Sequence, residues 1–336
     1  MTSKILPGRA SIRSADPSPL VSVVVITRNE EGNITRCLES IARELMGVPG
    51  EIIVVDSASA DRTREKASAF GARVISLGRE LPLSASAGRY AGTLSSVGDF
   101  VFFVDGDMTV AAGWMKAGLA SFTDERVAGV AGPFYWVYPG EQEHMGHRDH
   151  RPTGVVETLS GTALYRREAL LKAGTFNPWM KGEEERELGY RLTLAGFVLL
   201  RIDVPMAYHF AKDLVAAEAD EKAMHHVGIG QIFRKYPLAA ISRDLLRTYW
   251  RTFLEEGIIA AFPLLCIVLA VAGFPLAALM QILLATIGLL ALGMAKGIHK
   301  VLLFVRVRTL SFIRTLQGLG RGIPPAESYP WSPPNR

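Results

Sequence analysis

Two carboxylates in the N-terminal half of the chain stand at a spacing that suits a divalent cation. Asp105 and Asp107 flank Gly106, and the three directly follow the apolar run Phe100–Val104 (FVFFV). Carboxylates one residue apart at a strand end can approach one hard cation such as Mg²⁺ or Mn²⁺, which then neutralises a diphosphate. Gly106 lets the backbone bend close to a ligand. The alternative is an ordinary turn after a strand. Which of the two is present depends on the fold around the motif.

The segments around this motif predict an α/β fold. Apolar, β-branched runs without alternation indicate strands buried on both faces, and segments of helical periodicity separate them. The expected strands are Leu20–Thr27, Glu51–Val55, Arg73–Leu77 and Phe100–Val104, with helices from Ile34, over Asp61–Phe70 and around Ser84–Ser96. This rhythm predicts a doubly wound, mostly parallel sheet with helices on both faces.

Polar residues follow three of these strands. A parallel sheet binds its ligands at the carboxyl ends of the strands. The residues found there are Arg28, Asn29 and Glu30 after the first strand, Asp56 and Ser57 after the second, and the Asp105-Gly106-Asp107 motif after the fourth. The sequence therefore predicts a binding crevice at this edge of the sheet.

The alternation weakens after Gly132. Residues Glu141–Arg151, which include three histidines, read as a loop, and Thr158–Arg166 leads into a helix at Arg167–Ala173. A helix over Glu183–Ala195 opens with an acidic run, and Phe197–Val204 is expected to be the final strand.

At this point the chain resembles the family 2 glycosyltransferases, which have the GT-A fold. The matching blocks, in the family's order between Leu20 and Phe210, are VSVVVITRNEEGNITRCLESI, EIIVVDSASADRT, FVFFVDGDM, SGTALYRREAL and GEEERELGYRLTLAG. The resemblance implies an inverting transfer of a sugar from UDP or GDP to an acceptor hydroxyl, with a divalent cation, Mg²⁺ or Mn²⁺, as cofactor.

The resemblance also assigns residues to the donor. The nucleotide-sugar is expected to contact Thr27, Arg28, Glu30, Asp56, Ser57, Arg89 and Asp105, and the metal Asp105 and Asp107, with His209 as a third ligand or a diphosphate contact. Each assignment has a structural alternative. Glu30 can meet a helix dipole, Ser57 can form a turn, Arg89 can be a solvated arginine, and His209 a structural histidine. Tyr90 replaces the asparagine that usually follows the family's arginine.

The acidic run resembles the Glu-Asp motif on the family's acceptor side. Anchoring the register on Arg191, Leu192 and Gly196 places Glu184 and Glu185 on that pair. Glu185 then replaces the aspartate that serves as general base, and one extra methylene still lets the carboxylate reach. The alternative is an acidic helix N-terminus, which explains one or two of these acids.

The C-terminal third predicts a membrane anchor. Hydrophobic residues make up 49% of the chain, the mean hydropathy is +0.20, and the segment Gly257–Ala295 carries no charge. Gly273 and Pro275 break this segment into two short helices, Gly257–Ala272 and Pro275–Ala295, that either span the membrane or form a shallow re-entrant hairpin. Both flanks are basic, so both termini and the catalytic domain are expected in the cytoplasm at the inner membrane.

The net charge of +4 is also explained by a membrane anchor. The basic residues gather beside the apolar segment, which favours anionic membrane lipids over nucleic acid as the partner. Cys37 and Cys266 form no disulfide framework, consistent with a reducing compartment. The expected division is a disordered tail (1–18), the catalytic domain (19–215), interfacial helices (216–256), a transmembrane hairpin (257–296) and a basic cytoplasmic tail with an amphipathic helix (297–336).

An anchor of this kind suggests an acceptor at the bilayer surface. The sequence interpretation is therefore an enzyme of cell-envelope polysaccharide or glycolipid synthesis that acts on a lipid or lipid-linked saccharide. A polyprenyl-phosphate glycosyltransferase is the nearest alternative, and a non-catalytic membrane scaffold with a degenerate transferase domain is a weaker one. The TRNEEG sequence after the first strand is not the basic, glycine-rich loop of a nucleotidyltransferase.

Overall fold

A computed structural model describes residues 20–142, 146–210 and 215–334, with the side chains of 215–224 and 287–296 excepted. The predicted disordered tail lies outside these residues. The chain divides into two compact units. The first comprises the described parts of Met1–Met180, Glu184–Asp213 and Pro324–Arg336, and the second comprises Lys181–Glu183 and the described part of Leu214–Ile323.

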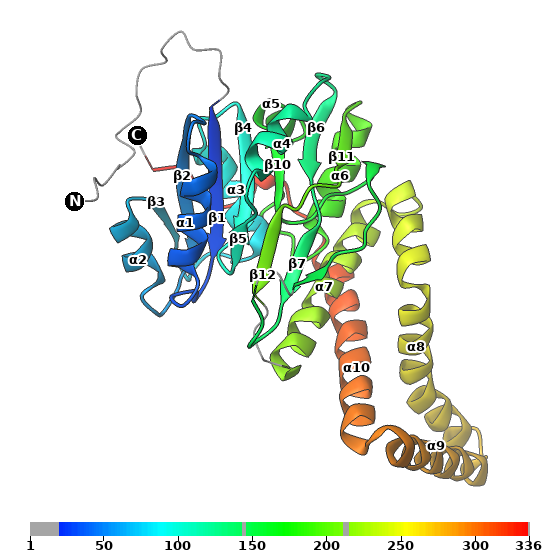
Figure 1. Ribbon diagram of the computed structural model, residues 1–336. Coiled ribbons are helices and arrows are strands. Elements are labelled where there is room, and N and C mark those ends of the chain that lie inside the picture. The colour runs from blue at the N-terminus through cyan, green and yellow to red at the C-terminus, as the bar shows by residue number, and fades with distance from the viewer. Residues whose placement is uncertain (1–19, 143–145, 211–214, 335–336) are drawn as a thin grey trace. The chain divides into compact units, whose positions relative to one another are not determined.

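The four predicted N-terminal strands form one side of the main sheet in the first unit (Figure 1). They are β1 (Val21–Thr27), β2 (Gly50–Ser57), β3 (Arg73–Leu77) and β4 (Phe100–Asp105), all parallel, in the order β3-β2-β1-β4. In this register Thr27 lies beside Asp56, and Ile26 lies beside Asp105. The strand ends that carry the predicted polar residues therefore lie next to one another at this edge of the sheet.

The other side of the sheet mixes parallel and antiparallel strands. Beyond β4 come β10 (Ala163–Arg166), β6 (Val127–Ala131), β11 (Val198–Arg201) and β9 (Gly154–Val156). Strand β10 is antiparallel to both β4 and β6, and β11 is parallel to β6. Consequently β6 and β11 end at the same edge as β1 and β4.

The crossover directions place helices on both faces, as predicted. The helices of this half are α1 (Ile34–Glu44), α2 (Thr63–Phe70) and α3 (Ala85–Ser95). The β1-α1-β2 and β2-α2-β3 crossovers run toward one edge, and β3-α3-β4 runs back across β2 and β1. Because such crossovers are right-handed, α3 must lie on the face opposite α1, and Figure 1 shows it there. Three further helices are α4 (Trp114–Ala120), α5 (Arg167–Lys172) and α6 (Glu184–Leu194).

A second, smaller sheet was not predicted. Its strands are β5 (Met108–Val110), β12 (Ala207–Phe210), β7 (Phe134–Val137) and β8 (His147–Arg148), in the order β5-β12-β7-β8. These strands are two to four residues long, too short for a periodic signal, and their pairing is non-local. Strand β8 lies inside the segment that we expected to be a loop.

The C-terminal segment returns to the first unit. Tyr329 is 3% exposed and packs edge-on against Tyr90 and Trp179, with ring centroids 6.1 and 5.5 Å apart. Asn177 Nδ2 donates a hydrogen bond of 2.9 Å to the carbonyl oxygen of Pro324.

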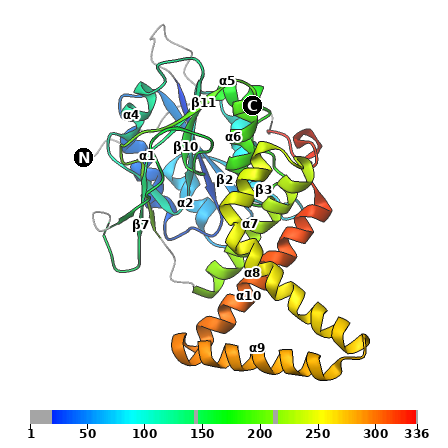
Figure 2. The ribbon, with the colours of Figure 1, turned by 90° about the vertical axis from the view of Figure 1, so that its right-hand side faces the viewer.

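The second unit is helical. It holds α7 (Val215–Lys235), α8 (Ala240–Val271), α9 (Pro275–Lys296) and α10 (Ile298–Arg321). Helices α7 and α10 pack at close range because both crossing positions are glycines. A Cβ on Gly230 would lie 2.0 Å from the carbonyl oxygen of Thr315, and one on Gly318 would lie 2.1 Å from that of Val227. Within this unit α9 runs crosswise between the far ends of α8 and α10 (Figure 2).

The apolar segment differs from the prediction. The expected interfacial helix and the first short helix run on into one element, α8, of 32 residues, which is kinked at Tyr249, where the dihedral angles are non-helical. Over the described residues α8 is the one helix long and apolar enough to cross a membrane, with a mean hydropathy of 2.2 in its most apolar window. The described apolar part of α9, Pro275–Thr286, is shorter, so the expected pair of candidate spans is corrected to one. The backbone does break at Gly273, as predicted, where φ is +86°.

Candidate active site

The turn after β4 lies tightly against the end of β1. Gly106 N donates to the carbonyl oxygen of Ile26 at 2.9 Å. A Cβ on Gly106 would lie 2.7 Å from Thr27 Oγ1, so this approach requires a glycine. Thr27 Oγ1 is buried and has no hydrogen-bond partner in the part of the chain that the structure describes. An unsatisfied hydroxyl at this edge is a donor and acceptor available to a ligand.

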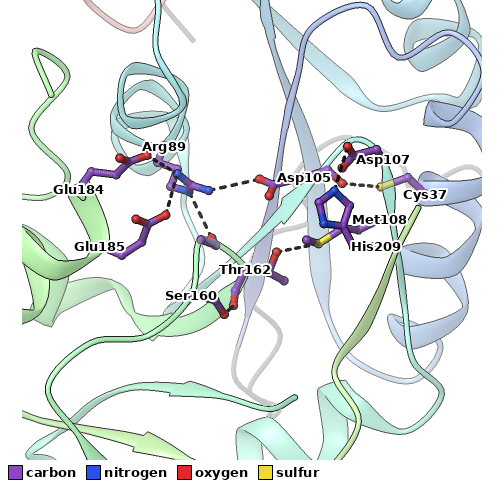
Figure 3. Close-up of polar contacts among 11 residues, drawn as sticks. Cys37, Arg89, Asp105, Asp107, Met108, Ser160, Thr162, Glu184, Glu185 and His209 are labelled. Carbon is purple, nitrogen blue, oxygen red and sulfur yellow. Dashed lines mark hydrogen bonds and ion pairs between the residues drawn. The ribbon is translucent and has the colours of Figure 1, made fainter. Parts of the chain in front are cut away.

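The two motif aspartates point in different directions (Figure 3). Asp105 Oδ1 lies 3.2 Å from Arg89 Nη2, and Asp107 Oδ2 lies 3.2 Å from His209 Nε2. The two carboxylates therefore do not face one point in this structure, and no set of three potential metal ligands converges among the described residues. The reason is electrostatic, since the nearby guanidinium attracts Asp105.

The donor set nevertheless suits Mg²⁺ or Mn²⁺. Asp107 and His209 already meet across β5 and β12, which pair in antiparallel register at Met108 and His209. Two carboxylates with one imidazole are ligands that Mn²⁺ accepts and Mg²⁺ tolerates. Asp105 reaches the same turn, and its side chain is 31% exposed. The atoms that these residues offer are therefore of the kinds that bind a divalent cation.

Aromatic rings support His209, and the sequence interpretation missed them. Trp136 in β7 is the direct register partner of His209, and the two ring centroids are 4.4 Å apart. Phe134 meets the same imidazole edge-on at 6.4 Å. The run Phe134-Tyr135-Trp136 is visible in the sequence, but only the non-local pairing of β7 with β12 shows what it contacts.

Arg89 is the centre of the polar network in Figure 3. Its side chain is 3% exposed, so the solvated alternative is excluded. Nε donates to the carbonyl oxygen of Gly161 at 3.2 Å, Nη2 meets Asp105, and Nη1 lies 2.9 Å from Glu184 Oε1 and 3.3 Å from Glu185 Oε1. Burial by itself lowers the pKa of Arg89, but the charges of Glu185, Asp105 and Glu184 together raise it above its ordinary value. The guanidinium is thus permanently charged.

The two predicted acceptor-side acids differ in accessibility. Helix α6 begins at Glu184, whose side chain is 6% exposed, whereas the side chain of Glu185 is 22% exposed. A group that takes a proton from an acceptor has to reach it. Glu185 is therefore the more accessible of the two, while Glu184 lies nearer to Arg89.

Hydrogen bonds join the loops after β1 and β2. Asp56 is fully buried, and its carboxylate accepts hydrogen bonds from the backbone N–H of Ser59 at 2.9 Å and from the Ser59 hydroxyl. Ser59 Oγ in turn accepts from Asn29 N at 2.8 Å. Asp56 thereby fixes one loop against the other, while Ser57 at the strand end is half-buried.

Arg28 and Glu30 stand on either side of Asn29. Arg28 is exposed, and Glu30 is 7% exposed. Glu30 Oε2 accepts from Asn33 Nδ2 at 2.7 Å, and the backbone carbonyl oxygen of Glu30 accepts from the backbone N–H groups of Asn33, the N-cap residue of α1, and of Ile34, its first residue. The side chain of Glu30 therefore contacts the N-cap of α1, whereas the side chain of Arg28 is open to solvent.

Comparison with known proteins agrees with this geometry. Residues 22–181, just under half of the chain, match the family model described as glycosyl transferase family 2. The matched segment contains the strand ends, Arg89 and both motif aspartates. This segment is thus similar to the family 2 glycosyl transferases, and it lies within an α/β domain whose sheet mixes parallel and antiparallel strands.

Sequence relatives cover part of that domain. The glucosyl-3-phosphoglycerate synthase of Mycobacterium tuberculosis is 34% identical over 102 residues, which are 29% of this chain and 32% of the relative. Glycosyltransferase AglE of Haloferax volcanii is 30% identical over 125 residues, 36% of this chain and 41% of the relative. The chain thus matches about a third of the length of these curated relatives.

Solved structures share the fold over most of the chain. A mannosyltransferase of Pyrobaculum calidifontis, PcManGT, in complex with GDP-Man and Mn²⁺, has a TM-score of 0.58 at 18% identity, covering 89% of this chain and 87% of that one. Residues 1–349 of TarS from S. aureus, in complex with UDP-GlcNAc, have a TM-score of 0.50 at 20% identity, covering 90% and 91%.

Proposed function

We propose that this protein transfers a sugar from UDP or GDP to a hydroxyl group of a lipid or lipid-linked saccharide, with inversion at the anomeric carbon. One observation carries the proposal. A single buried guanidinium, that of Arg89, joins Asp105 of the donor-side motif to the Glu184–Glu185 pair of the acceptor side. In a direct displacement the acceptor attacks the donor, so the residues that bind the donor and those that bind the acceptor must be neighbours.

Each residue then has a defined task. Thr27, Arg28 and Ser57 contact the nucleotide, with Asp56 and Glu30 holding their loops. Asp105, Asp107 and His209 would hold a divalent cation, which supplies charge neutralisation to the leaving diphosphate. Glu185 takes the proton of the attacking hydroxyl. Arg89 positions Glu185 and Asp105, because it contacts both.

The solved relatives support a nucleotide-sugar donor. One holds GDP-Man with Mn²⁺ and another holds UDP-GlcNAc. These two donors differ in both base and sugar, so they support the class of donor and leave its identity to experiment.

The helical unit supports a membrane-bound acceptor. Helix α8 exposes large apolar side chains along its length, among them Trp250, Leu254, Ile258 and Leu264. Exposed apolar surface of this extent is suited to lipid. We propose that α8 enters the inner membrane from its cytoplasmic side and that the shorter α9 follows it as a re-entrant segment, with the basic residues before and after them at anionic headgroups.

A panel of labelled nucleotide-sugars tests the function. Purified full-length protein is incubated with each UDP- and GDP-sugar, Mg²⁺ or Mn²⁺ and a total membrane lipid extract. We expect label to enter the organic phase with one donor class. Label that stays entirely in the aqueous phase with every donor, for protein that binds nucleotide normally, would contradict a lipid-linked acceptor.

Cysteine accessibility tests the membrane topology. In a Cys266→Ala background, Ser11→Cys and Gly320→Cys should both react with an impermeant maleimide from the cytoplasmic side only, since both flanks of the hairpin are basic. Phe274→Cys, in the turn before α9, should react from the opposite side if the hairpin spans the bilayer, and from neither side if it is re-entrant. Reaction of Ser11→Cys and Gly320→Cys from opposite sides would refute the hairpin.

A further inference from the structure

A cavity of about 270 Å³ lies at the same sheet edge as the candidate active site, and the proposed mechanism does not use it. Ala131 and Arg201, the last residues of β6 and β11, line it from one side. The segment that leads from β9 to β10 lines it from the other, with Val156, Leu159 and Ser160. Because β6 and β11 end where β1 and β4 end, the cavity opens at the ligand-binding edge of the sheet.

Buried charge distinguishes this cavity from an ordinary surface depression. Arg201 is 6% exposed, and its Nη2 lies 2.7 Å from Asp149 Oδ2. Its Nε is buried without a hydrogen-bond partner among the described residues. Arg151, which also lines the cavity, lies 2.9 Å from the same Asp149 oxygen. Two guanidinium groups thus share one carboxylate, which leaves one positive charge without a partner in this group.

The pKa of Arg201 lies below the ordinary value of an arginine. Burial, first, lowers the pKa of Arg201. Asp149 opposes this effect, but the positive charges of Arg151 and Arg148 lower the pKa further. Glu157 also lines the cavity, yet it is exposed and its charge is screened by solvent. A buried cation in this situation gains stability from an anionic ligand.

Two chains of contact connect the cavity to the active site. On one side, Ser160 precedes Gly161, whose carbonyl oxygen accepts the hydrogen bond from Arg89 Nε. On the other, the guanidinium of Arg151 lies 5.3 Å from the centre of the Phe134 ring, and that ring contacts His209. The cavity is therefore connected to Arg89 through Gly161 and to His209 through Phe134, and both of these residues belong to the candidate active site.

The remaining walls are mainly apolar. Ala131, Pro152, Val156 and Leu159 leave room for carbon atoms, while the two arginines stand together. A free inorganic anion would leave these walls without contacts. The shape suits a molecule that carries its anionic group on an apolar skeleton.

We propose that this cavity is an acceptor subsite, in which Arg151 and Arg201 bind a phosphate or carboxylate of the acceptor and the apolar walls pack against the adjoining carbon atoms. The subsite rests on the proposed transferase function for its role. The binding of an anion there is a separate physical property, which can be measured without turnover.

The test measures the binding of simple anions to full-length protein in detergent micelles by isothermal titration calorimetry. The probes are inorganic phosphate, butyl phosphate and butyrate, with saturating UDP or GDP and Mg²⁺ present so that the donor site is filled. We expect butyl phosphate or butyrate to bind at least about fivefold more tightly than inorganic phosphate, because each buried methylene favours binding. Preference for the phosphate or for the carboxylate probe then identifies the anion.

Substitutions locate the site. Arg201→Gln and Arg151→Gln should each weaken binding of the preferred probe at least about tenfold, since each removes a charged hydrogen-bond donor. Arg148→Gln is the matched control, because Arg148 is a neighbouring arginine that pairs with Asp203 and does not line the cavity. It should change the affinity less than about threefold. Arg201→Lys keeps the charge and should retain part of the binding. It shows whether a loss of binding in Arg201→Gln comes from the lost charge or from misfolding.

The outcomes separate the two proposals. No anion binding by the wild type, or unchanged binding in both Arg151→Gln and Arg201→Gln, overturns the subsite. Normal anion binding without any sugar transfer overturns the proposed function and leaves the anion site standing.

Discussion

Asp107→Asn should reduce sugar transfer at least about 10³-fold and weaken donor binding. Asp107 is the motif carboxylate that contacts His209, and asparagine keeps the shape and a hydrogen bond to that histidine while losing the negative charge. A metal ion contributes several kcal/mol of charge stabilisation, and each 1.36 kcal/mol is about a factor of ten in rate. Initial rates with the accepted donor, together with titration of Mn²⁺ binding by electron paramagnetic resonance, measure both effects.

The controls separate charge loss from misfolding. The circular dichroism spectrum and melting temperature of Asp107→Asn should match the wild type, since the side chain is partly exposed and asparagine has nearly the same shape. Asp124→Asn is the matched substitution, because Asp124 forms its ion pair with Arg126 in an exposed turn. It should leave the rate unchanged. Full activity of Asp107→Asn, or of the wild type in excess EDTA, would remove the metal from the mechanism.

The parts of the fold that follow from local sequence were predicted. Strands β1 and β4 are continuous apolar runs, and their parallel pairing brings Thr27 and Asp105 to one edge, as their position after buried strands implied. Local patterns suffice here because a strand buried on both faces has little choice of side chains.

The second sheet could not be predicted in the same way. Strand β12 pairs with β5 across about a hundred residues, and both are only a few residues long. The contact of Trp136 with His209 depends on that pairing. Which strand a short strand pairs with depends on how the whole chain folds. The few residues of the strand itself do not indicate that partner.

The candidate site shows the same limit. The sequence placed Arg89, Glu184 and Glu185 near the reaction, but it did not show that one guanidinium contacts both acids and Asp105. Residues 89 and 184 are far apart in the chain and meet only because α3 and α6 face the same strand ends. The divergence of Asp105 from Asp107 follows from this contact.

Glu185→Gln should reduce turnover about 10²- to 10⁴-fold, the usual contribution of a general base, while donor affinity changes little. Glutamine keeps the size of the side chain and its contact with Arg89 but cannot take a proton, so a neutral hydroxyl has to attack unaided. A loss confined to turnover indicates a role in the transition state rather than in ground-state binding. Single-turnover rates and donor titrations of the same preparations measure the two quantities separately.

Glu184→Gln has to be measured beside it, because the register of the acidic run leaves one residue of ambiguity. Glu184 is the more buried of the two and lies 2.9 Å from Arg89, so its loss should act through the position of Arg89 and affect binding more than turnover. Glu168→Gln, in the first turn of α5, is a control for removing an acid from a helix N-terminus.

A polyprenyl-phosphate acceptor would give a different result, since its oxygen is already ionised and needs no base. Nearly wild-type turnover in Glu185→Gln would therefore contradict the hydroxyl mechanism and favour a phosphate acceptor.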